Sequence, residues 1–141
     1  MKKALVLGGS GFIGSHLVEL LQKNKYKTHI FDLVEPKGFS FLGEFHKGSI
    51  VDYKSLESSV ALIKPDVIFD CSGVLGTAET FNHIETAVDV NIKGTLNVLE
   101  IGKKYDIPTI YIGLTNKWLN PYTITKTAAE RFCMMYAKEF K

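Results

Sequence analysis

The sequence predicts an α/β fold built on a doubly wound parallel sheet. Short apolar runs alternate with amphipathic stretches along all 141 residues, and no linker or internal repeat interrupts them. Four glycines follow the first apolar run within seven positions, 8–14. Strands that alternate with helices are typical of a parallel sheet with helices on both faces. A chain of this length fits one domain.

Five strands are expected, each an apolar run bounded by small or polar residues. They cover residues 2–7, 28–33, 41–48, 66–73 and 108–113, and the third is the weakest. Each run is short enough for a buried strand, and the intervening segments are long enough for helical crossovers.

Four helices are expected, over residues 12–24, 52–63, 84–104 and 120–140. Asp52 caps the second helix, and Asn120 followed by Pro121 opens the last one. Apolar spacing predicts the inward face of the first three helices. These faces are Phe12, Ile13, Leu17, Leu20 and Leu21 in the first, Leu56, Val60 and Ile63 in the second, and Val88, Ile92, Leu96 and Leu99 in the third.

Composition argues against several classes of protein. The net charge is +2, from 17 basic and 15 acidic residues, without the basic stripe of a nucleic-acid-binding protein. The first apolar run, residues 4–7, is too short for a secretory signal or a membrane span. We therefore predict a soluble cytoplasmic protein with no nucleic-acid or membrane partner.

Cysteine and histidine usage predicts neither disulfides nor a metal site. Cys71 and Cys133 lack CxxC spacing, so free thiols are expected. The histidines show no spacing typical of metal ligands, so we expect surface or packed side chains and no metal. They are His16, His29, His46 and His83.

The glycines Gly8, Gly11 and Gly14 predict a phosphate site at the first strand-to-helix turn. Such glycines allow a tight turn, a close approach of pyrophosphate and close packing of helix on strand. Unpaired N–H groups and the helix dipole favour an anion there. Asp32 ends the second strand 18 residues after Gly14, where a carboxylate accepts hydrogen bonds from ribose hydroxyls and repels a 2′-phosphate. NAD is therefore favoured over NADP, and a glycine turn without a cofactor is the alternative.

Tyr122 and Lys126 are spaced i and i+4, so both lie on one face of the last helix. Thr115 follows the fifth strand, and the carboxyl ends of parallel strands share one edge of the sheet. A phenol must lose about 3 pKa units to act as a base near neutrality. One ammonium at ~4 Å can lower the pKa of a phenol by about that amount. The pair therefore predicts a general base, and the alternative is two residues of a solvated helix surface.

With these residues the chain resembles the N-terminal domain of an extended short-chain dehydrogenase/reductase of the nucleotide-sugar epimerase and dehydratase kind. The resemblance implies a Rossmann NAD-binding domain over residues 1–141 that stops after the sixth helix of the family's fold, here the helix at 120–140, with the C-terminal substrate domain absent from this chain. Such a chain is a fragment or one piece of a split enzyme. The matching segments are GGSGFIG at 8–14, Asp32, GSIVD at 48–52, FDCSG at 69–73, VNIKGTLNVLE at 90–100 and PYTITKTAAE at 121–130.

The resemblance also implies a role for each matching residue. Tyr122 is the general base, Thr115 hydrogen-bonds the reacting oxygen, and Lys126 also holds the nicotinamide ribose. Asn116 and Lys117 replace the Asp-Glu pair of sugar 4,6-dehydratases, which disfavours dehydration. Relatives dimerise through the equivalents of helices 84–104 and 120–140. The remaining cofactor contacts are Gly8, Gly11, Phe12, Ile13 and Gly14 at the pyrophosphate, Asp32 at the ribose, Ser49 and Ile50 at the adenine, and Cys71, Ser72 and Gly73 along the middle of the cofactor.

The predicted function is the NAD-binding catalytic core of a nucleotide-sugar epimerase-type oxidoreductase. Tyr122 removes the proton of a sugar hydroxyl while hydride passes to the nicotinamide. An NAD-dependent keto-sugar reductase or dehydrogenase is the alternative within this class. A non-catalytic dinucleotide-binding module and a domain that does not fold alone are the alternatives outside it.

Overall fold

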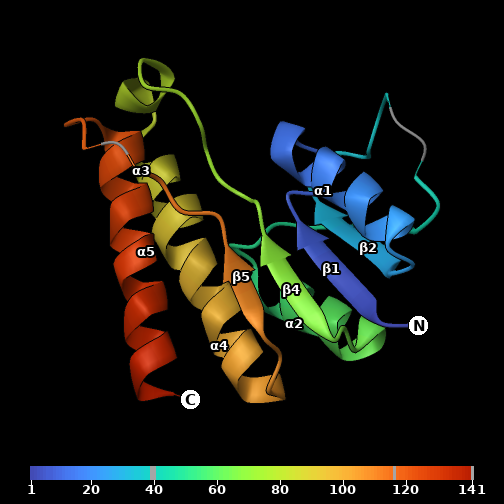
Figure 1. Cartoon of the computed structure of the whole chain (residues 1–141). Coiled ribbons are helices and arrows are strands. Elements are labelled where there is room, and N and C mark those ends of the chain that lie inside the picture. The colour runs from blue at the N-terminus through green and yellow to red at the C-terminus, as the bar shows by residue number, and fades with distance from the viewer. Residues whose placement is uncertain (39–40, 116, 141) are drawn as a thin grey trace.

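The computed structural model describes residues 1–38, 41–115 and 117–140. Among them, one five-stranded sheet runs in the order β3-β2-β1-β4-β5 (Figure 1). Every neighbouring pair of strands is parallel, so the predicted fold class is confirmed. The strands are β1 (Lys3–Leu7), β2 (Lys27–Asp32), β3 (Glu44–Lys47), β4 (Val67–Asp70) and β5 (Thr109–Tyr111).

Helices follow the strands as predicted, with an irregular stretch before the third. A π-helical segment, η2, joins α3 to α4 in one continuous helix, and α5 carries the tyrosine–lysine pair. In Figure 1, α4 and α5 lie side by side next to β5. The elements are α1 (Phe12–Lys23), α2 (Tyr53–Ile63), η1 (Glu79–Asn82), α3 (Ile84–Ala87), η2 (Val88–Gly94), α4 (Thr95–Tyr105) and α5 (Pro121–Glu139).

The two faces of the sheet bury separate apolar clusters, because side chains alternate along each strand. On one face, Val18 and Leu21 of α1 cover Ala4, Val6 and Ile30. On the other face, α2 and α4 cover the strands. This second cluster consists of Leu5, Leu7, Phe31, Ile50, Leu56, Val60, Ile63, Ile68, Val98 and Ile101.

The predicted caps are confirmed. The Asp52 carboxylate accepts a hydrogen bond from the Ser55 amide at 3.1 Å. The Asn120 side chain accepts one from the Thr123 amide at 2.8 Å, and Pro121 is the first residue of α5. In α2, Leu56, Val60 and Ile63 are buried as expected.

The predicted inward face of α1 is partly wrong. Phe12, Ile13 and Leu20 are 82%, 54% and 57% exposed. The buried residues of this helix are Gly14, Val18 and Leu21. One of the buried positions, Gly14, lies against the backbone of Gly8 and Gly9 and has no apolar side chain, so apolar spacing does not identify it.

The predicted face of the third helix is also wrong in part. Val88 is 42% exposed, and Ile92, Leu96 and Leu99 are only half-buried. The buried positions mix small and polar residues with two large apolar ones, so hydrophobic spacing does not identify them. They are Ala87, Asn91, Gly94, Thr95, Val98, Ile101 and Gly102. Across the described residues, no helix has both the length and the apolar character needed to cross a bilayer.

Candidate functional site

The turn between β1 and α1 requires glycine at two positions. Gly8 has φ +69°, and a Cβ there would lie 2.8 Å from the backbone of Ser72 after β4. A Cβ on Gly14 would overlap the Gly8 carbonyl oxygen and lie 2.7 Å from the Gly9 Cα. Both glycines therefore allow close packing at the point where the strand order reverses between β1 and β4, which is where ligands bind in such sheets.

Gly11 has a different environment. A Cβ there would meet one atom within 4 Å, the Gly8 carbonyl oxygen at 3.3 Å. Gly11 caps α1 without a side-chain hydrogen bond, and Phe12 and Ile13 follow it as exposed residues. The amino end of α1 thus presents a bare backbone surface that a side chain would fill. This cradle fits a pyrophosphate, because amides at a helix start bind anions.

Asp32 lies beside this turn, at the end of β2. Its Oδ2 accepts a hydrogen bond from the Ser10 amide at 3.0 Å, and its Oδ1 accepts one from the Val34 amide at 3.3 Å. The Ser10 hydroxyl donates to the Val34 carbonyl at 2.6 Å, which ties the two loops together. Each carboxylate oxygen offers two acceptor sites, so Asp32 keeps capacity for ribose hydroxyls.

The two residues expected at the adenine lie in different environments. Ile50 is buried in the core cluster and packs against Gly94. Ser49 is half-buried, and its hydroxyl accepts a hydrogen bond from the Val51 amide at 3.3 Å. Of the pair, Ser49 therefore presents its side chain nearer the surface. Adenine contact by either residue stays a prediction.

The residues after β4 surround a buried carboxylate, Asp70. Its Oδ1 accepts hydrogen bonds from the amide (3.1 Å) and the hydroxyl of Ser72, and its Oδ2 accepts one from the Thr95 hydroxyl at 3.5 Å. Burial raises the pKa of Asp70, while Ser72 and then Lys126 oppose that rise. Burial, with Asp70 next, also raises the pKa of the Cys71 thiol to about 11. Both cysteines are free thiols, as expected.

Lys126 is buried beside this carboxylate. Its Nζ lies 4.1 Å from the centre of the Tyr111 ring, and the Tyr111 hydroxyl donates to the Lys126 carbonyl at 3.3 Å. Burial lowers the pKa of Lys126, and Asp70 opposes that shift. Tyr122 is half-buried in the first turn of the same helix. Tyr122 and Lys126 thus both belong to α5, and the lysine side chain lies in the buried cluster with Asp70 and Tyr111.

The loop before α5 carries Thr115, which is exposed. Its approach to a reacting oxygen stays a prediction. Asn116 lies outside the described residues, and Lys117 is exposed.

Sequence reasoning assigned no role to Asn91, which connects the site. Its Oδ1 accepts a hydrogen bond from the Val74 amide at 2.8 Å, and its Nδ2 donates to the Val74 carbonyl at 3.2 Å. The same Nδ2 donates to the Thr125 hydroxyl at 2.9 Å. Asn91 therefore holds the loop after β4 against α5. The available signal in the sequence is an asparagine, one of two in a helix whose buried face is predicted from its apolar residues alone.

A groove of about 980 Å³ lies between α4, β5 and α5 and reaches Tyr111. Leu99, Lys103, Cys133 and Phe140 are among its lining residues, and none of the predicted cofactor or catalytic residues lines it. The candidate site is the open carboxyl edge of the sheet, where the glycine turn, Asp32 and Lys126 lie, because the backbone amides and charged groups gather there.

Known proteins share this architecture. The chain is 28% identical to a putative UDP-glucose 4-epimerase of Methanocaldococcus jannaschii, over 94% of this chain and 50% of that protein. It is 30% identical to a UDP-N-acetyl-alpha-D-glucosaminuronate decarboxylase of Bacillus cytotoxicus, over 96% and 50%. The chain thus spans about half the length of the curated relatives it matches.

Solved structures also match this chain over about half of their own length. The UDP-glucose 4-epimerase of Thermotoga maritima, solved with UDP-glucose, superposes with a TM-score of 0.89 at 27% identity, over 98% of this chain and 52% of that one. A monomeric L-threonine 3-dehydrogenase from a metagenome has a TM-score of 0.86 at 28% identity, over 97% and 50%.

A family model matches nearly the whole chain, over residues 4–141, and its description agrees with the cofactor expected from Asp32 and the glycine turn. The chain belongs to the NAD dependent epimerase/dehydratase family.

Proposed function

We propose that this chain is the NAD-binding catalytic core of a nucleotide-sugar epimerase-type oxidoreductase. The observation that carries the proposal is the gathering of the glycine turn, Asp32 and the Lys126 cluster at one edge of the sheet. The turn follows β1, Asp32 ends β2, and Asp70 ends β4, on strands adjacent in the order β2-β1-β4. A dinucleotide needs these three kinds of contact side by side.

The residues present fit NAD. The amino end of α1 at Gly11 would hold the pyrophosphate, Asp32 the adenosine ribose, and Lys126 the nicotinamide ribose. Phe12 and Ile13 would flank the phosphates, and Ser72 would line the path between the two ends. When bound, NAD supplies an acceptor for hydride.

Tyr122 is the phenol that we assign as the general base. Tyr111 also lies beside Lys126, but burial and then the charge of Asp70 raise its pKa, so it keeps its proton at neutral pH. Tyr122 would take the proton from a substrate hydroxyl onto its own oxygen, and the Lys126 ammonium would stabilise the phenolate electrostatically. Thr115 would orient the substrate oxygen from the preceding loop.

The names of several relatives favour a nucleotide-sugar as substrate. UDP-glucose 4-epimerase is the name of relatives in Mycoplasma pneumoniae and in Thermotoga maritima. A second candidate is an NAD-dependent dehydrogenase, because the threonine dehydrogenase matches this chain at similar identity. Net production of NADH distinguishes the two, since an epimerase returns the hydride to its substrate.

A homodimer through α5 and the helix at 84–104 is part of the proposal. Phe132, Met134 and Met135 of α5 are exposed apolar side chains that such an interface would cover. Light scattering of the purified chain should then give twice the mass of 15.7 kDa. A monomer at every concentration would remove the dimer from the proposal and leave the cofactor site untouched.

The test is Tyr122→Phe, with NAD binding measured by calorimetry and turnover of UDP-glucose followed by NMR. We expect turnover to fall by about 10²–10⁴-fold, the usual contribution of a general base, while NAD affinity changes far less. The matched control is Tyr105→Phe, an exposed tyrosine at the end of α4, which should behave as wild type. Turnover that survives Tyr122→Phe would contradict the assignment of the base. NAD binding without any turnover would favour the non-catalytic module, and no NAD binding would overturn the proposal.

A further inference from the structure

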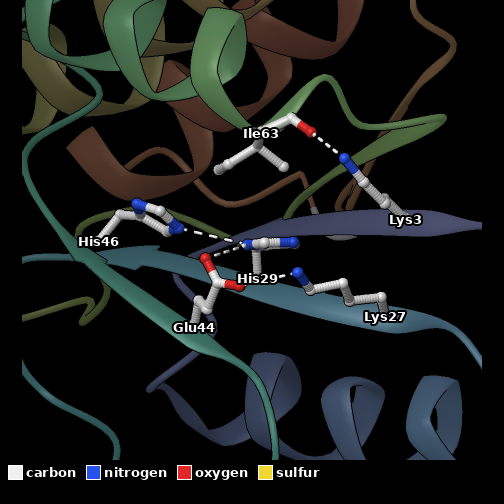
Figure 2. A network of polar contacts seen from close by, with 6 residues as sticks. All are labelled: Lys3, Lys27, His29, Glu44, His46 and Ile63. Atoms are coloured by element: carbon white, nitrogen blue, oxygen red, sulfur yellow. Dashed lines mark hydrogen bonds and ion pairs between the residues drawn. The ribbon is translucent and has the colours of Figure 1, made fainter.

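A cluster of three potential metal ligands lies on the sheet, and none of the three belongs to the proposed NAD site (Figure 2). His29 belongs to β2, while Glu44 and His46 belong to β3. In the parallel register His29 pairs with Glu44, and Phe31 pairs with His46. Side chains two positions apart on a strand share a face, so all three point to the side of the sheet that α2 and α4 cover. The spacing of the histidines in the sequence predicts no metal site, and only the strand pairing brings them together.

The donor atoms are as close as ligands of one ion. His29 Nδ1 lies 3.2 Å from His46 Nε2 and 3.7 Å from Glu44 Oε2, and the three ligand atoms all lie within 4.8 Å of one another. Tetrahedral zinc holds nitrogen and oxygen ligands at about 2.0–2.2 Å, which places any two of them roughly 3.4 Å apart. Small side-chain adjustments would therefore place all three donors on one ion.

We propose that His29, Glu44 and His46 bind a divalent transition-metal ion, for which Zn²⁺ is the probe. Two imidazoles and one carboxylate form a donor set typical of zinc with an open fourth position. The ion would join β3, the four-residue edge strand, to β2.

The surroundings orient two of the ligands. Lys27 Nζ holds Glu44 Oε1 at 2.8 Å, which leaves Oε2 as the oxygen that faces His29. In metal sites, hydrogen-bond and ion-pair partners of this kind orient the side chains that bind the metal directly. His29 is 2% exposed, and its Nε2 is buried with no hydrogen-bond partner among the residues that the structure describes, so the polar contacts seen for this ring are made through Nδ1 within the cluster.

The charges around the cluster set the conditions for binding. Burial lowers the pKa of His29 and of His46, with Glu44 opposing both shifts. Lys27 and Lys3 oppose a cation electrostatically. Lys3 Nζ donates to the Ile63 carbonyl at 2.8 Å, away from the donors (Figure 2). We therefore expect weaker binding than in a site without neighbouring cations.

The test uses the full chain stripped with a chelator and titrated with ZnCl₂ by calorimetry and thermal denaturation. Wild type should bind one equivalent and melt at a higher temperature with zinc, because a ligand of the folded state stabilises it. Glu44→Gln and His46→Gln should each weaken affinity at least ten-fold. Glu44 is exposed, so its variant keeps the fold, which circular dichroism checks. The matched control is His83→Gln, an exposed histidine outside the cluster, and it should bind as wild type does.

Co²⁺ as a spectroscopic probe identifies the ligands. Visible d–d bands of a four-coordinate ion, without a thiolate-to-metal charge-transfer band, would support the two histidines and Glu44. A thiolate band would point to Cys71 or Cys133 and overturn the proposal. A lack of zinc binding by wild type, or equal affinity in wild type and both cluster variants, would overturn it as well.

Discussion

Asn91 Nδ2 donates a hydrogen bond to the Thr125 hydroxyl at 2.9 Å, across 34 residues of sequence and between two buried side chains. Thr125 directly precedes Lys126 on α5, and its hydroxyl also contacts the Pro121 carbonyl at 2.7 Å. Asn91 holds the loop after β4 through Val74 at the same time. One amide therefore sets the helix of the proposed catalytic residues against the loop that is expected to line the cofactor.

We expect this contact to give a measurable coupling energy in a double-mutant cycle. Asn91→Ala and Thr125→Val should each lower the free energy of unfolding by about 1–3 kcal/mol, because each leaves a buried partner unsatisfied. The double variant should lose less free energy of unfolding than the two single variants lose together, by about 0.5–3 kcal/mol. Chemical denaturation of the four proteins measures it. The control cycle pairs Thr125→Val with Asn97→Ala, whose amide donates to the Ile50 and Val51 carbonyls, and this pair should be additive. Additivity in both cycles would contradict the coupling.

Substitutions at two glycines of the first turn should affect folding and cofactor binding differently. Gly14→Ala drives a Cβ into backbone atoms of Gly8 and Gly9 and should cost about 1–3 kcal/mol of stability. Gly11→Ala meets only the Gly8 carbonyl oxygen and should cost about 1 kcal/mol or less, because φ −78° suits alanine. NAD affinity should nevertheless fall at least ten-fold in Gly11→Ala, because the methyl group occupies the cradle. Melting temperatures and calorimetry measure the two effects, and unchanged NAD affinity in Gly11→Ala would place the pyrophosphate elsewhere.

Asp32 should determine the relative affinities of the chain for NAD and NADP. Asp32→Asn removes a carboxylate that accepts charge-assisted hydrogen bonds, each worth about 1.5–3 kcal/mol, so NAD affinity should fall about 10- to 150-fold. The ratio of NADP to NAD affinity should rise, because the negative charge that repels a 2′-phosphate is gone. Calorimetry with both cofactors measures this. Asp106→Asn, at an exposed left-handed helix end, is the control and should leave both affinities unchanged.

The two clustered histidines should make stability depend on pH. Burial lowers the pKa of His29 and His46 in the folded state below the ordinary value of 6.5, against the opposing charge of Glu44. Lys27 and Lys3 add to the shift at His29. Between the lowered pKa and 6.5 the unfolded chain binds more protons, so stability is lost as the pH falls through this window.

We therefore expect the melting temperature in chelator to fall from pH 7.5 to 5.5, and to fall less in the double variant His29→Gln, His46→Gln. The raised pKa of Asp70 acts in the opposite sense, because it stabilises the fold at low pH and loses that effect as pH rises. Asp70 is present in both proteins, so the comparison removes its contribution. Equal pH dependence in the two proteins would contradict a role for the histidine pair.

Local signals predicted much of the fold, because strands and caps depend on residues close in sequence. Asp52 and Asn120 cap their helices as expected, and Asp32 ends β2 as expected, while its contact with a ribose stays a prediction. The faces of α1 and of the helix at 84–105 could not be predicted in full. Gly14, Asn91 and Gly94 are buried there, and a pattern of apolar residues does not detect glycine or asparagine.

By itself, the sequence determined the alternation of strands and helices, the glycine turn and the i, i+4 pair of Tyr122 and Lys126, because these depend on residues within one or two turns of each other. Only the tertiary structure decided which distant side chains meet. The packing of η2 on α5 sets Asn91 against Thr125, and the register of β2 with β3 sets His29 beside His46. The physical reason is that strand register and helix packing depend on contacts throughout the core, so the spacing of residues along the chain does not predict them.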